Sequence, residues 1–287
     1  MTAAGLDLRR TLAVASSIAV ATALALPGVA AAARVYGGSV GPGTAFPIFP
    51  DPLYLTTDAA NGGITGLGLT FSVICLPNAF PVTVDTRRVV PRSSLGTNRL
   101  PEPGVLVIED ADGGRFSATL SQPGRGGERV DLRLNGTVTR HRASGTVRAR
   151  VTAADGTRSC DSSGLQWRAV RDPGRVYAGS ARGVGPVVLR RGKRNVELTV
   201  GYYAECAPSA WIRAAGRFLA GIQGGRFRER ASAQVPELDI DYRSDVDGRV
   251  GARRASGTFR TTIRRFSEGK VVSRCRVPVT RWTSATG

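Results

Sequence analysis

The sequence RASGTFRTTIRRFSEGKVVSRCRVPVTRW, residues Arg254–Trp282, carries the pattern from which the fold class of this 287-residue chain is predicted. It has an earlier counterpart in RASGTVRARVTAADGTRSCDSSGLQW, residues Arg142–Trp167. Both begin with Arg-Ala-Ser-Gly-Thr, and both end with a cysteine that a tryptophan follows seven residues later. Gly-Gly-Arg-Phe also occurs twice, at Gly113–Phe116 and Gly224–Phe227. The chain is therefore a tandem repeat, and its two units are expected to fold alike.

Apolar and polar residues alternate through both units, as in Val130–Leu134, Val147–Val151 and Phe259–Ile263. A period of two is typical of half-buried antiparallel strands. Turn signals recur about every 8–12 residues, which is the spacing of all-β domains. The sequence therefore predicts an all-β protein of two tandem antiparallel domains. Each is expected to be a β-sandwich or a small up-and-down barrel, and the pattern does not separate the two.

Several dipeptides are expected to form hairpin turns, among them Asn135-Gly136, Asp247-Gly248 and Glu268-Gly269. Only Ala210–Ala220 is compatible with a short helix. Gly216 weakens that helix prediction, because glycine is a poor helix former.

Residues 1–33 have the pattern of a signal peptide. Arg9 and Arg10 precede an apolar run, Leu12–Leu26, and Ala31–Ala33 supplies a small-residue cleavage site. The apolar run is short for a membrane span, which needs about 20 residues. The mature chain is therefore expected to lack a transmembrane span and to be secreted or associated with the cell envelope. The two arginines leave open whether export is of the Sec or the twin-arginine type.

Two domains are expected after this segment, at residues 34–170 and 175–285, and the second is a repeat of the first. Asp172-Pro173-Gly174 between them has the composition of a short linker.

The four cysteines of an exported chain indicate two disulfides. Four cysteines allow three pairings, and the repeat selects Cys75–Cys160 and Cys206–Cys275. Trp167 and Trp282 recur with the cysteines and are expected to pack in the core against these bonds. Zinc is disfavoured, because the chain has no C-x-x-C pair and only one histidine, His141. No metal or cofactor is expected.

The order of motifs is shared by both units: a Tyr-x-Gly opening, a strand that ends in Cys, a Gly-x-Phe strand, an x-Ala-x-Gly-Thr strand and a closing Cys followed by Trp. The second unit carries them at Tyr177–Gly179, Cys206, Arg226-Phe227, Arg254–Thr258, Cys275 and Trp282. The first unit carries them at Tyr36–Gly38, Cys75, Arg115-Phe116, Arg142–Thr146, Cys160 and Trp167. This order resembles an uncharacterised family of secreted, disulfide-bonded β-domain proteins of high-GC actinobacteria. The resemblance implies a secreted tandem β protein and carries no activity with it.

Positive charge is concentrated in the second unit. Residues 175–287 hold 22 basic and 9 acidic residues, a net charge of +13, whereas residues 34–174 hold 16 and 12, a net charge of +4. Such an excess favours anionic partners, here a cell-envelope polymer or lipid headgroups. Nucleic acid is disfavoured because the chain shows no basic, aromatic platforms on which bases would stack. The candidate anion-binding residues are Arg190, Arg191, Lys193, Arg194, Arg228, Arg260 and Arg264.

Two other patterns suggest chemistry. Gly37–Gly41 fits G-x-S-x-G with Ser39 as nucleophile, but that motif needs a strand-to-helix turn and a histidine base, for which His141 is the only candidate. Asp239, Asp241, Asp245 and Asp247 form an acidic cluster that departs from the EF-hand spacing. A solvated strand face that offsets neighbouring arginines is preferred there, and calcium binding is left open.

The leading hypothesis is a non-catalytic binding module of the cell envelope or extracellular space, which holds anionic polymer or lipid. The first alternative is a carrier that binds a small ligand inside its β domains. The second is a serine hydrolase acting through Ser39. The oligomeric state and the identity of the ligand stay open.

Overall fold

The computed structural model describes residues 33–41, 50–58, 62–75, 78–96, 101–207, 210–235 and 239–287. The expected signal peptide, residues 1–33, lies outside these ranges apart from Ala33. Within the described ranges, no helix has the length and apolar character that crossing a bilayer would require.

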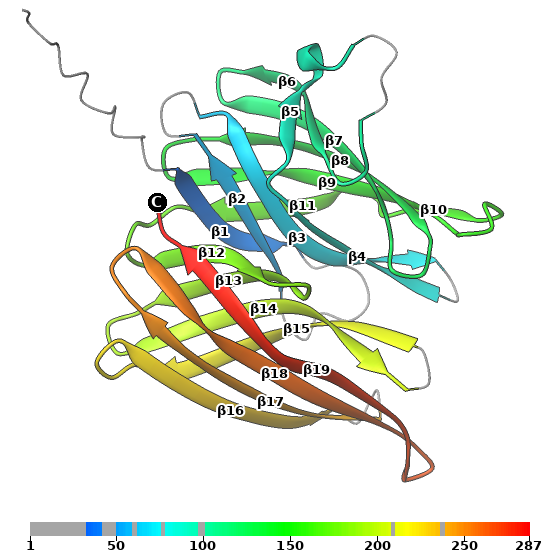
Figure 1. Cartoon of the computed structure of the whole chain (residues 1–287), viewed down its shortest axis with the longest axis vertical. Helices are drawn as coiled ribbons and strands as arrows, with labels where there is room; N and C mark the ends of the chain where they lie inside the picture. The colour runs from blue at the N-terminus through cyan, green and yellow to red at the C-terminus, as the bar shows by residue number, and fades with distance from the viewer. Residues whose placement is uncertain are drawn as a thin grey trace, which may run out of the picture. The chain divides into compact units, whose positions relative to one another are not determined.

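The first β-sheet has 11 strands in the order β4-β3-β2-β1-β11-β9-β8-β7-β6-β5, with β10 paired to β9 (Figure 1). Neighbouring strands run antiparallel, apart from the parallel pair β5–β6. The elements are β1 (Arg34–Val40), β2 (Asp51–Thr57), β3 (Ile64–Cys75), β4 (Asn78–Thr86), β5 (Val89–Pro91), the 3-10 turn η1 (Arg92–Ser94), β6 (Leu106–Asp112), β7 (Arg115–Pro123), β8 (Arg129–Val138), β9 (Arg142–Thr152), β10 (Ser159–Asp161) and β11 (Leu165–Val170).

The second β-sheet has 8 strands in the order β15-β14-β13-β12-β19-β18-β17-β16. It consists of two antiparallel meanders, β12–β15 and β16–β19, which meet where β12 pairs with β19. The elements are β12 (Val176–Ala181), β13 (Gly185–Arg191), β14 (Asn195–Cys206), β15 (Ala210–Gly221), β16 (Arg226–Val235), β17 (Ile240–Val250), β18 (Arg254–Ser267) and β19 (Lys270–Ala285).

The two sheets share one topology. Without β5 and β6, the first order matches the second strand for strand, with β10 and β11 together in the place of the long strand β19. The predicted all-β class, with two tandem antiparallel domains of sandwich or barrel type, is confirmed. The first sheet ends at Val170 and the second begins at Val176. That residues 34–170 and 175–285 are independent domains stays a prediction.

Each domain contains a row of four residues that lie opposite one another on neighbouring strands, at equivalent positions of the two sheets. In the second domain, Phe227 lies opposite Gly248, Gly248 opposite Gly257, and Gly257 opposite Trp282. The corresponding row of the first domain is Phe116, Gly136, Gly145 and Trp167. Both tryptophans are buried within large apolar clusters, one in each domain.

Two hairpin predictions were wrong at these rows. Asn135-Gly136 lies inside β8 and Asp247-Gly248 inside β17, not in turns. A Cβ atom on Gly248 would lie 2.6 Å from Cζ2 of Trp282, and one on Gly136 would lie 2.4 Å from Cζ2 of Trp167. Glycine at these two positions leaves the space that the indole ring of the tryptophan occupies. The turn at Glu268-Gly269 does form, with φ of 52° and 74°.

The helix suggested for Ala210–Ala220 is also wrong, because these residues form strand β15. Residues Ala210–Gly221 pair with β14 along its whole length, from Cys206 to Asn195. The long partner edge of β14 supplies backbone hydrogen bonds that outweigh the weak local preference for a helix.

Cys206 and Cys275 form a disulfide, as predicted. They are direct cross-strand partners where β14 pairs with β19. Cys160 is also disulfide-bonded. The side chain of Cys75 lies outside the part of the chain that the structure describes, so the Cys75–Cys160 pairing stays a prediction.

The two sheets contact each other through a small apolar cluster and a buried ion pair. Val35 and Tyr54 of the first domain pack with Ala178 and Val188 of the second. Beside them, Arg213 on β15 forms an ion pair with Asp51 on β2.

Candidate anion-binding surface of the second domain

Three turns lie together at one end of the second domain. They join β13 to β14, β15 to β16 and β17 to β18, and they are residues 191–195, 221–226 and 250–254; we call this region the turn end. Asn195 at the start of β14 lies opposite Gly221 at the end of β15. The backbone N–H of Ile222 donates to the carbonyl oxygen of Arg194 at 2.9 Å, which ties the first two turns together.

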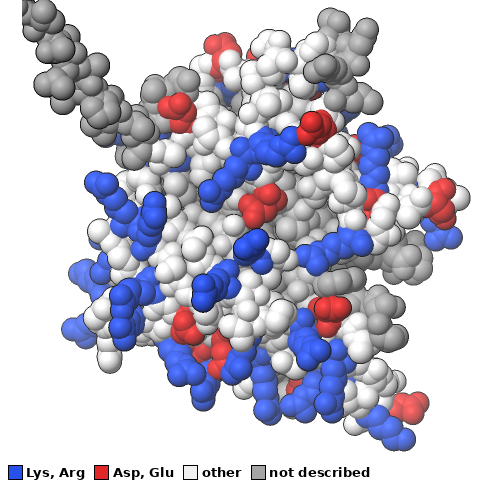
Figure 2. Space-filling view, viewed as in Figure 1, with Lys and Arg blue, Asp and Glu red and all other residues white. Residues whose placement is uncertain are grey.

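The turn end is strongly basic. No acidic residue occurs in its three turns. Figure 2 shows Lys and Arg side chains gathered along the left edge of the view, over these turns. The exposed cations in the turns and directly beside them are Arg190, Arg191, Lys193, Arg194, Arg226, Arg249, Arg253 and Arg254. None of these side chains belongs to an ion pair with a residue that the structure describes.

Further along the sheet, acids neutralise part of the basic surface. Asp245 on β17 forms ion pairs with Arg230 on β16 at 3.0 Å and with Arg260 on β18 at 2.7 Å. The hydrogen bond from Arg260, together with the positive charge of its neighbours, lowers the pKa of this carboxyl below its usual value. Arg260, one of the predicted anion-binding residues, is therefore already paired within the sheet.

Of the acidic cluster, Asp239 precedes β17, and only Asp245 forms ion pairs with described residues. Asp241, Asp245 and Asp247 alternate along the strand, and each lies opposite an arginine of a neighbouring strand. Among the described residues, no group of three His, Cys, Asp or Glu side chains is arranged to hold a metal ion. Guanidinium groups beside Asp245 favour the solvated strand face over a calcium loop.

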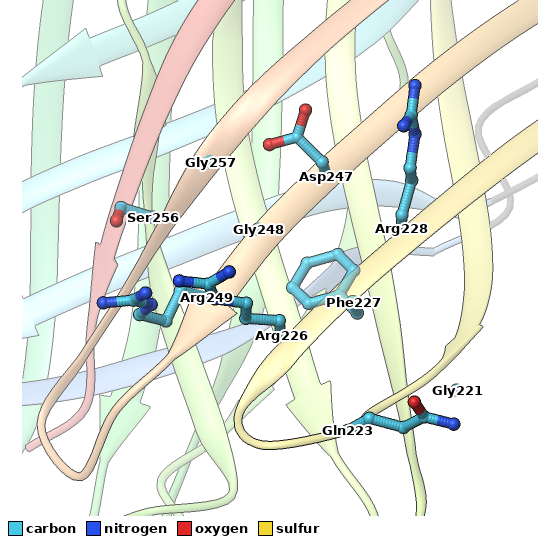
Figure 3. A pocket seen from close by; sticks show the side chains of 10 residues that line it. All are labelled: Gly221, Gln223, Arg226, Phe227, Arg228, Asp247, Gly248, Arg249, Ser256 and Gly257. Carbon is cyan, nitrogen blue, oxygen red and sulfur yellow. The ribbon is translucent and has the colours of Figure 1, made fainter.

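A shallow pocket of about 670 Å³ adjoins the turn end (Figure 3). Arg226 and Arg249 line it as a cross-strand pair, and Arg228 and Asp247 line it as the next pair along the same two strands. In Figure 3, Arg226 and Arg249 lie together on one side of the pocket and Arg228 on the other side of Asp247. Cross-strand pairs on one face of a sheet are separated by about 7 Å along the strand.

The charged groups of the pocket keep hydrogen-bonding capacity free. Oδ2 of Asp247 accepts a hydrogen bond from the Thr258 hydroxyl at 2.7 Å, which leaves its second oxygen available. Gln223 and Ser256 contribute further polar groups to the lining.

The first domain has the same backbone positions with different side chains. Arg115, Thr137 and Ser144 lie in one row of register, where the second domain has Arg226, Arg249 and Ser256. The next row holds Ser117, Asn135 and Thr146, where the second domain has Arg228, Asp247 and Thr258. The charge of the pocket is therefore particular to the second domain.

The predicted residues are distributed unevenly over this surface. Arg190, Arg191, Lys193 and Arg194 lie at the turn end, and Arg228 lines the pocket. Arg264 lies outside both, half-buried and opposite Asp241 and Arg274.

Sequence reasoning missed Arg249, because Asp247-Gly248 was expected to end a strand. Aligning the Phe-Gly-Gly-Trp rows of the two repeats would have placed Arg249 inside a strand, level with Arg226.

The serine motif lacks the context that a nucleophile elbow requires. Ser39 lies within strand β1, paired with Pro52 on one side and Arg168 on the other, and not at a strand-to-helix turn. His141 is exposed in the turn between β8 and β9. No hydrogen bond joins these two side chains among the hydrogen bonds of the described residues.

Comparison with known proteins finds no matching family model, curated protein or solved structure. The function is therefore inferred from the charges, pairings and shape of this surface.

Proposed function

We propose that this protein is a secreted, non-catalytic binding module, which holds an anionic polymer or lipid surface of the cell envelope through its second domain. The observation that carries the proposal is the group of exposed cations at the turn end, none of which forms an ion pair with a described residue. Cations in exposed turns attract polyanions over several ångströms without a large desolvation cost, because they remain hydrated. Binding of this kind is screened by salt.

The disulfide supports the location outside the cytoplasm. A bond such as Cys206–Cys275 persists in oxidising compartments and is rare where thiols are kept reduced. This agrees with the signal peptide predicted over residues 1–33.

The packing of the second domain favours a surface site over an internal ligand. Phe259 is fully buried, and its ring centroid lies 5.1 Å from that of Tyr202 and 5.8 Å from that of Phe218. Aromatic side chains thus occupy the interior that a carrier would use for its ligand. The strand position of Ser39 likewise gives the hydrolase hypothesis no support.

The test is a binding measurement on the chain from Arg34 to Gly287, which contains every described strand. Binding to isolated cell-envelope polymer and to vesicles of anionic lipid is measured across a salt series. Wild-type binding should fall steeply as salt rises. Replacing Arg190, Arg191, Lys193 and Arg194 together by Glu should abolish it at moderate salt.

A matched control carries the same change of net charge on the first domain. The control replaces four exposed residues by Glu: Arg133, Arg140, Arg148 and Arg158. It should retain most of the binding. Equal losses in both variants would show that net charge alone acts, and unchanged binding in the first variant would refute a role for the turn end.

A further inference from the structure

The pocket beside the turn end has a charge pattern that a plain polyanion site would not have. Two cations, Arg226 and Arg249, form one cross-strand pair, while a cation and an anion, Arg228 and Asp247, form the next. A site selected only for negative charge would not place a carboxylate between its cations, since Asp247 repels every anionic group of the ligand.

We infer that this pocket binds one stretch of a polymer in which anionic groups alternate with hydroxyl-bearing units. This inference rests on the proposed function and deepens it, by assigning the chemistry of the ligand. The shared chemistry is that of a phosphodiester-linked polyol and of a polysaccharide of uronic acids.

Each group of the pocket has a partner in such a polymer. Arg226 and Arg249 donate to one phosphate or carboxylate, for which the planar guanidinium group is suited. The free oxygen of Asp247 accepts a hydrogen bond from a hydroxyl of the adjoining unit, because a carboxylate is a strong acceptor of hydroxyl hydrogen bonds. Arg228 meets the next anionic group, about 7 Å further along the strand.

The repeat provides substitutions that the scaffold already tolerates. Asn135 and Ser117 occupy, in the first domain, the positions of Asp247 and Arg228, and Thr137 occupies that of Arg249. Because the same rows of strand register carry these residues, Asp247→Asn, Arg228→Ser and Arg249→Thr are expected to leave the fold intact. Circular dichroism and thermal unfolding check this.

The decisive variant is Asp247→Asn, because plain electrostatics and the inferred site predict opposite results. Affinity is measured at constant salt for poly(glycerol phosphate), polygalacturonate and inorganic polyphosphate, the last of which has no hydroxyl-bearing units. Removing a negative charge should strengthen binding of polyphosphate. It should weaken binding of whichever hydroxyl-bearing polymer the protein prefers by about tenfold, because the single oxygen of Asn keeps the bond from Thr258 and its NH2 group cannot accept from the ligand hydroxyl.

A second pair of variants tests the arginines. Arg228→Ser with Arg249→Thr removes two charges from the pocket. Arg243→Ser with Arg276→Thr removes two from the same sheet outside the pocket lining, where both residues are exposed. The first variant should lose at least tenfold in affinity for the preferred polymer, and the second should lose much less.

The outcomes separate the two levels of the proposal. Preference for poly(glycerol phosphate) identifies the phosphodiester source, and preference for polygalacturonate the uronate source. If Asp247→Asn strengthens binding of all three polymers, the inference about hydroxyl-bearing units is overturned while the proposed function stands. If wild-type protein binds none of the polymers, the inference is overturned, and failure to bind anionic vesicles as well would overturn the proposed function.

Discussion

Gly136 and Gly248 lie in strand interiors, where glycine usually weakens a sheet. Here each faces the indole ring of the tryptophan that follows the last cysteine of its repeat, Trp167 or Trp282. The absence of a side chain is therefore a packing requirement. It explains why a dipeptide that is typical of turns occurs in the middle of a strand in both domains.

Gly248→Ala should destabilise the protein. Its Cβ would meet Cζ2 of Trp282 at 2.6 Å and the ring of Phe227 at 2.7 Å, both from buried side chains with little room to move. Overpacking of this kind costs about 1–3 kcal/mol, measurable by urea unfolding. Gly96→Ala is the control, because no described residue lies within 4 Å of the added atom. Equal stability of the two variants would contradict the packing argument.

Strand β19 pairs with three other strands of the second sheet. It pairs with β18 along most of its 16 residues, with β12 near its C-terminal end, and with β14 at Cys206 and Cys275. The disulfide joins the two meanders at the place where β12 and β13 no longer separate β14 from β19. The disulfide and the pairing of β14 with β19 therefore both hold the two meanders together at this place.

Replacing both Cys206 and Cys275 by Ala should lower the free energy of unfolding by about 4 kcal/mol, the chain-entropy expectation for a bond that spans 69 residues. Thermal or urea unfolding measures the change. Wild-type protein unfolded without reductant is the reference, with thiol titration to show that no other cysteine has become free. A change below about 1 kcal/mol would mean that the strand pairing holds the junction without the bond.

At the level of the whole molecule, a buried ion pair connects the two domains. Arg213 is paired with Asp51, and it donates hydrogen bonds to the hydroxyls of Thr70 at 3.2 Å and Ser72 at 2.9 Å. Burial lowers the pKa of Arg213 to about 10, so the side chain stays charged at neutral pH. The contact between the domains therefore has a polar part around Arg213 and an apolar part around Tyr54 and Val188.

Arg213→Met should be costly, because it leaves the carboxylate of Asp51 buried without its partner. Removing one member of a buried pair costs about 3–5 kcal/mol. Adding Asp51→Asn should restore part of the loss, since the unpaired charge is then gone. Arg129→Met, which breaks the exposed ion pair with Asp131, should cost less than about 1 kcal/mol. All four proteins are compared by urea unfolding, and a double variant no more stable than Arg213→Met alone would contradict the argument.

Features that depend on local pattern could be predicted from the amino-acid sequence. Alternation of apolar and polar residues predicted the strands, and the repeat predicted both the two-domain β class and the Cys206–Cys275 bond. The strand predictions are correct because successive side chains of a strand point to opposite faces of the sheet. The alternation therefore shows which face is buried, whichever strand lies beside it.

Features that depend on which strands are neighbours became visible in the folded protein. Asp245 pairs with Arg230 and Arg260 because of the register between β16, β17 and β18. The same register places Arg226 opposite Arg249, and neither forms an ion pair with a residue that the structure describes. The register of these strands depends on side chains elsewhere in the sequence. One of them is Trp282 on β19, whose ring packs against Gly248 and Gly257. For this reason the basic character of the second domain could be predicted from the sequence, whereas the pocket within it depends on the strand register of the folded domain.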